Sequence, residues 1–160
     1  GQDRSLWDGA AIRDGLALVR QALAHPPAGR YALMAAIAAV HAEAQCFADT
    51  DWHQLVGLYD LLLRRWPSPV VALNRAVAVS YHDGPLAALV VVQALSDDPS
   101  LATYPYLAAT RADLLRRLNR PVEAIAAYQE ARLLTENSTE AGFLAGRIRE
   151  LENDPGPADR

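Results

Sequence analysis

The chain has 160 residues, about half of them apolar, and a formal net charge of −4. This length suffices for one domain with a hydrophobic core, but no apolar run reaches the roughly 20 residues that cross a bilayer. The basic residues are dispersed, which argues against direct contact with nucleic acid. Cys46 has no second cysteine to pair with, which favours a reducing, cytoplasmic compartment. No signal peptide is visible, and Gly1 in place of Met indicates an excised fragment.

Apolar periodicity and boundary residues predict eight helices. After a lead-in of residues 1–7, the first helix covers about 8–24 and an alanine-rich second helix covers about 29–47. The third and fourth follow Thr50 and Ser68. The last four are expected over about 85–96, 104–118, 121–135 and 138–152. Residues 153–160 are predicted to be a disordered tail.

The segment 49–85 is predicted to form a helical hairpin that the rest of the chain repeats. Its first helix carries one apolar face, formed by Trp52, Leu55, Val56, Tyr59, Leu62 and Leu63. Thr50 is the expected N-cap of this helix, and Pro67 ends it. Ser68 is the expected N-cap of the next helix, which Pro69 begins. So short a connection requires the two helices to lie antiparallel, face against face.

Three local features give sharper expectations. The helix at 85–96 is apolar on nearly every side, so we expect it to be buried between neighbours. Asn119 lies where the chain must turn with a left-handed backbone. Asn137 and Glu140 have the spacing of a capping box at the start of the last helix.

The helices repeat along the chain. Aligned helices place Val19, Tyr59, Val91 and Tyr128 in one column, separated by 40, 32 and 37 residues, close to the roughly 34 of tetratricopeptide repeats. No segment alternates with the two-residue period of a strand. The sequence therefore predicts an all-α fold, a tetratricopeptide-like right-handed helical-hairpin solenoid of about eight helices, as one domain over 8–152.

One cluster raises the question of a metal site, because six potential ligands lie within a short segment. They are His41, Glu43, Cys46, Asp49, Asp51 and His53. Zinc sites usually use ligands at helical i, i+4 spacing or Cys-x₂-Cys spacing, and the residue four after His41 is Gln45, a poor zinc ligand. We therefore favour capping and packing roles over a metal. The chain also lacks nucleophile, phosphate-binding and dinucleotide motifs. We therefore expect neither a cofactor nor an enzyme.

Two polar residues fall on apolar stripes, Asn74 in the fourth helix and Arg111 in the sixth. A polar group in such a position must find a partner or cost a few kcal/mol. Arg111 is expected to pair with a carboxylate such as Asp60 or Glu130, and Asn74 to bond a neighbouring loop. A groove lined by these polar groups is the alternative. Arg75, about 100° further round the helix, is expected to face a partner.

The chain resembles a known family through five strings in order. They are QDRSLWD, AAIAAVHAEA, DTDWHQLVGLYDLLL, PSPVVALNRAVAV and RADLLRRL. Together they are similar to the tetratricopeptide-like C-terminal extension of one group of extracytoplasmic-function (ECF) RNA polymerase sigma factors, over residues 2–152. This resemblance implies a regulatory domain of a bacterial transcription factor. The implied partners are sigma regions two and four of the same chain, core RNA polymerase, or both.

Two other hypotheses remain open, a free-standing repeat adaptor that binds a partner peptide in its groove, and a small metal-dependent enzyme around His41 to His53. For partner binding we expect two separate patches about 20 Å apart, at opposite ends of the third helix. The candidate residues are His41, Asp49, Asp51 and Trp52 at one end and Asn74 and Arg75 at the other.

Overall fold

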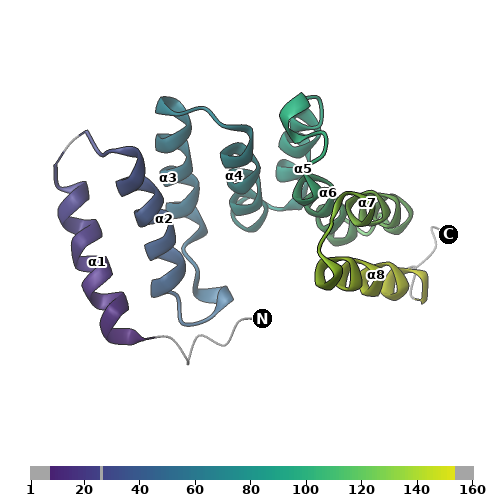
Figure 1. The fold of residues 1–160 in the computed structure, drawn as a ribbon, viewed down its shortest axis with the longest axis horizontal. Coiled ribbons are helices and arrows are strands. Elements are labelled where there is room, and N and C mark those ends of the chain that lie inside the picture. Colours follow the sequence, from purple (N-terminus) through teal and green to yellow (C-terminus); the bar gives the residue numbers. More distant parts are fainter. Residues whose placement is uncertain (1–7, 26, 154–160) are drawn as a thin grey trace. The chain divides into compact units, whose positions relative to one another are not determined.

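The computed structural model of the chain describes residues 8–25 and 27–153. Within these ranges it contains eight α-helices and no strand (Figure 1), which confirms the predicted all-α fold of helical hairpins. The helices are α1 (Gly9–Leu23), α2 (Arg30–Glu43), α3 (Trp52–Arg65), α4 (Pro69–His82), α5 (Pro85–Leu95), α6 (Pro105–Arg117), α7 (Pro121–Leu134) and α8 (Ser138–Asn153). Short 3₁₀ turns, η2 (Phe47–Asp49) and η3 (Pro99–Leu101), precede α3 and α6.

The chain divides into two compact units where the sequence predicted one domain. The first unit ends at Ala78 and the second begins at Val79, inside α4. The predicted lead-in 1–7 and residues 154–160 of the predicted tail lie outside the described residues. Among the residues described, no helix has the length and apolar character needed to cross a membrane.

The first unit has its core between α2 and α3. Its buried cluster consists of Leu33, Ile37 and Val40 of α2 and Leu55 and Leu62 of α3, together with Ala78 of α4. The guanidinium of Arg65 donates to the backbone oxygen of Ala28 over 2.9 Å, which ties the end of α3 to the segment before α2. By contrast, α1 lies against α2 without a fully buried residue of its own.

The second unit is built on an alanine seam between α6 and α7. Five alanines with 2% exposure or less form it, Ala108, Ala112, Ala124, Ala127 and Ala131. Side chains this small let two helix backbones approach closely, and α6 and α7 are the most extensively packed pair of helices in this unit. Tyr128 lies within this packed region, where burial raises the pKa of its phenol.

Several predicted boundary features are confirmed. As predicted, helices begin at Pro69, Pro85 and Pro121, where a residue without an N–H suits a position that has no helical partner. Pro105 begins α6 in the same way, although it was not predicted to do so. The hydroxyl of Ser68 accepts from the N–H of Val71 at the start of α4. Asn119 has a φ of 57°, the left-handed conformation expected of it. Gly84 has a φ of 97°, which only glycine adopts without strain, and it ends the turn after α4.

Other expectations are wrong in detail. Instead of reaching Phe47, α2 ends at Glu43, because Ala44 leaves the helix in an extended conformation. The N-cap of α3 is Asp51 instead of Thr50, since the Asp51 carboxylate accepts from the N–H of Gln54 over 2.9 Å. At the start of α8, Asn137 accepts from two backbone N–H groups, but the Glu140 carboxylate bonds Tyr106 and Thr135 in place of closing the capping box.

The predicted complete burial of α5 is also wrong. Ala88, Leu89 and Val92 are buried, yet Leu86 and Val90 are each 63% exposed. An all-apolar helix does not reveal which of its sides neighbouring helices cover, because every side has the same character.

Candidate functional site

Three aromatic rings gather where α2 leads into α3, and we call them the aromatic edge: His41, Phe47 and Trp52. The rings of His41 and Trp52 meet edge to face, with centroids 6.0 Å apart and planes at 72°. The ring of Phe47 lies 5.0 Å from that of Trp52 and is 53% exposed. Phe47 was missed by the sequence analysis, which placed it at the end of a helix. Such amphipathic aromatic surfaces are common at protein interfaces.

The two predicted carboxylates of this edge have local partners. Asp49 accepts from the thiol of Cys46 over 3.1 Å, and Asp51 caps α3. Of the four predicted site residues, Asp49 and Asp51 thus lie on the connection between α2 and α3, and His41 and Trp52 lie in the helices on either side of it. Across the described ranges, no three His, Cys, Asp or Glu side chains are arranged to hold a metal ion.

The second predicted patch consists of Asn74 and Arg75, and the burial of these two residues is the reverse of what the sequence predicted. Asn74, expected on the buried stripe of α4, is exposed. Arg75, expected to face a partner, is half-buried and donates to the Asp60 carboxylate of α3 over 2.6 Å. The predicted internal pairing of Arg111 is confirmed, since its guanidinium forms an ion pair with Glu130 of α7.

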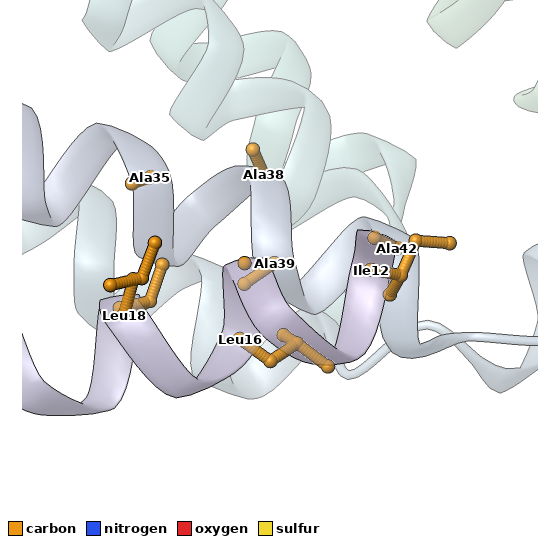
Figure 2. Close-up of a pocket in the computed structure, with 9 residues that line it drawn as sticks. Ile12, Leu16, Leu18, Ala35, Ala38, Ala39 and Ala42 are labelled. Carbon is orange, nitrogen blue, oxygen red and sulfur yellow. The ribbon is translucent and has the colours of Figure 1, made fainter. Parts of the chain in front are cut away.

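An open apolar groove between α1 and α2 is a feature the sequence analysis did not find. It has a volume of about 410 Å³ and is lined by aliphatic side chains and one glycine: Ile12, Gly15, Leu16, Leu18, Val19, Ala35, Ala38, Ala39 and Ala42. Figure 2 shows the longer side chains of α1 opposite the alanines of α2. The i, i+3, i+4, i+7 spacing of those four alanines was a signal in the sequence that pointed to this face.

The groove combines an uncharged lining with charged surroundings. None of the nine lining residues is charged. The Arg20 guanidinium of α1 donates to the Glu43 carboxylate of α2 over 3.3 Å, and both side chains are largely in solvent. An exposed pair of this kind adds little stability. The groove therefore favours an apolar ligand surface over a charged one.

Thr50, next to the aromatic edge, gives a test of local packing. Its side chain is buried, and its hydroxyl has no hydrogen-bond partner among residues 8–25 and 27–153. Replacing the hydroxyl by a methyl group in Thr50→Val should raise the free energy of unfolding by about 1–2 kcal/mol, because an unsatisfied buried polar group is removed. Chemical denaturation measures this change. Thr50→Ser keeps the hydroxyl, so a gain in that control would contradict the explanation.

The described residues thus define an all-α protein of helical hairpins, with an aromatic edge and an apolar groove in its first unit. The chain is 42% identical over 154 residues to an uncharacterized protein of Rhizobium meliloti (strain 1021). The match covers 96% of this chain but 36% of that protein, so the chain spans about a third of the relative's length. No protein-family model matches the chain, and no solved structure matches it.

Proposed function

We propose that the chain is a non-enzymatic, regulatory domain of a cytoplasmic ECF-type sigma factor. In this role it modulates transcription initiation through contacts with sigma regions two and four of its own polypeptide, or with core RNA polymerase. The observation that carries the proposal is the ordered set of five strings similar to the extension of that sigma-factor group. Four of them, at 35–44, 49–63, 67–79 and 111–118, lie on α2, α3, α4 and α6 and the turns beside them.

The length of the Rhizobium relative supports a role within a larger protein. About two thirds of that protein lies outside the part matched by this chain. Such a length leaves room for further domains on the same polypeptide, to which a repeat domain can dock. Repeat proteins commonly bind partners along the surfaces that their stacked helices present.

We place the docking site in the groove between α1 and α2, and its occupant is an apolar helix face from the rest of the same polypeptide. The lining is aliphatic throughout, so it suits the apolar stripe of an amphipathic helix. The four alanines of α2 leave space for the larger side chains of such a helix. Leu18, which lines the groove, is 66% exposed in the isolated chain and would lose this exposure on docking.

A charge placed in the groove tests this docking. In the full-length factor, Leu18→Glu should reduce transcription from a cognate promoter about tenfold, because an unpaired carboxylate would be buried against the partner. The melting temperature of the domain should not change, since Leu18 is exposed in it. The measurements are reconstituted transcription with core polymerase and thermal unfolding.

The matched control is Leu133→Glu, which introduces the same charge on α7, where Leu133 is 83% exposed and lies outside the groove. It should leave transcription and stability unchanged. Equal transcription by both variants would contradict docking in the groove. The free-standing adaptor remains the alternative function, and a reading frame without sigma regions would favour it over a sigma factor.

A further inference from the structure

A small pocket opens in the second unit between the first turns of α6 and α8. Its volume is about 220 Å³, and its lining includes Pro105, Tyr106, Ala109, Glu140, Phe143 and Leu144. Pockets for drug-sized ligands measure about 300–1,000 Å³. A pocket of this smaller size suits a single side chain of a partner.

Two exposed aromatic residues line the pocket. Tyr106 is 51% exposed and Phe143 is 60% exposed, although both line the pocket. The ring of Tyr106 is held by Tyr104, whose centroid is 5.3 Å away, and by its hydroxyl, which donates to Glu140 over 2.6 Å. These rings are therefore available to a ligand and, in the case of Tyr106, fixed in orientation.

Glu140 gives the pocket its charge, and it is the one ionisable carboxylate in the lining. One of its oxygens accepts from Tyr106, and the other accepts from the Thr135 hydroxyl over 2.8 Å. The hydrogen bond from Tyr106, and then that from Thr135, lowers the pKa of Glu140, so the group is ionised at neutral pH. A carboxylate accepts about four hydrogen bonds, which leaves capacity for a ligand's donors.

The neighbouring cation does not cancel this charge. Arg147 donates to the Glu150 carboxylate over 2.8 Å, and its guanidinium lies 5.1 Å from the centre of the Phe143 ring. Arg147 is thus paired with a carboxylate other than Glu140. Its position also shows that the Phe143 ring accepts a cation against it.

From this geometry we propose that the pocket binds a basic side chain, lysine or arginine, of a partner peptide. The aliphatic stem lies against Ala109, Leu144 and the two rings, and the cationic head lies at Glu140 and the ring surfaces. The inference concerns the second unit and does not rest on the transcriptional role proposed for the chain.

The test uses the full 160-residue chain and four capped glycine peptides that differ in their central residue. That residue is lysine, arginine, norleucine or glutamate. In amide ¹H–¹⁵N NMR spectra, the lysine and arginine peptides should shift the amide resonances of Ala109, Phe143 and Leu144. The dissociation constants from these shifts should lie in the millimolar range. Equal binding of norleucine would overturn the proposal, because the pocket would then recognise only apolar surface. Absence of shifts with both basic peptides would also overturn it.

Variants identify the pocket as the site of binding. Glu140→Gln and Phe143→Ala should each weaken the binding of the lysine peptide about tenfold. Phe143 is largely exposed, so its variant stays folded even if Glu140→Gln does not. Tyr106→Phe keeps the ring and should retain binding, since it frees an oxygen of Glu140. The control is Glu136→Gln, an exposed carboxylate outside the lining. A loss in the control equal to that of Glu140→Gln would mean unspecific attraction and would contradict the proposal.

Discussion

Leu55→Ala should lower the free energy of unfolding of the first unit by about 2–5 kcal/mol, the usual cost of removing a buried leucine side chain. Leu55 has no exposed surface and belongs to the buried cluster of the first unit. Its removal leaves a cavity that the surrounding Leu33, Ile37 and Leu62 fill only in part. Denaturant unfolding followed by circular dichroism measures the loss.

The matched control is Leu61→Ala on the same helix. Leu61 is 44% exposed and lies outside the cluster, so the expected change is within about 0.5 kcal/mol. Because both substitutions remove the same atoms from α3, helix propensity affects them equally. Similar losses in the two variants would show that the core of this unit does not lie between α2 and α3.

The positions of the helices were largely predictable because proline and the helical period act locally. Pro69, Pro85 and Pro121 begin helices where the sequence analysis placed them. Each proline fixes φ near the helical value and lacks the N–H that a first turn leaves unpaired. The end of α2 was not predictable in this way, since its alanines continue through Ala44 without a stop residue.

The buried side of α4 was misjudged for a physical reason. The sequence analysis placed Asn74 on an apolar stripe of this helix, but Asn74 is exposed, as are Val70 and Tyr81 at the same helical spacing. The buried stripe is Leu73, Ala76 and Ser80, in which only Leu73 has a large side chain. Close packing of helices selects small residues, so side-chain size is a poor guide to which side is covered.

The candidate site was predictable only where its residues are close together in the sequence. His41, Asp49, Asp51 and Trp52 lie together because they are on, or directly beside, the short connection between α2 and α3. The groove and the pocket in the second unit depend on how neighbouring helices are spaced, which periodicity does not determine. The role of Arg117 was not predictable from the sequence either. Arg117 lies in the last turn of α6, where a basic residue is usually explained by its interaction with the helix dipole alone.

Arg117 connects α6 to the end of α4 and should be the polar residue whose loss costs most in the second unit. Its guanidinium donates to the Ser80 hydroxyl over 2.8 Å and to the Ser80 backbone oxygen over 2.6 Å. The same group lies 4.5 Å from the centre of the Tyr81 ring. The Ser80 carbonyl is in the last turn of α4, and Ser80 is only 2% exposed.

Arg117→Ala should therefore lower the free energy of unfolding by about 2–3 kcal/mol, because it leaves the buried carbonyl and hydroxyl of Ser80 without this donor. Arg117→Lys should recover part of this loss, since an ammonium can reach one oxygen but cannot form the planar fork or stack as well on Tyr81. Arg120→Ala is the control, because it removes only an exposed ion pair with Glu123 and should cost less than about 1 kcal/mol. Urea denaturation of the three variants measures these losses in the free energy of unfolding and ranks them. If Arg117→Ala costs no more than Arg120→Ala, the bonds to Ser80 do not hold α6 against α4.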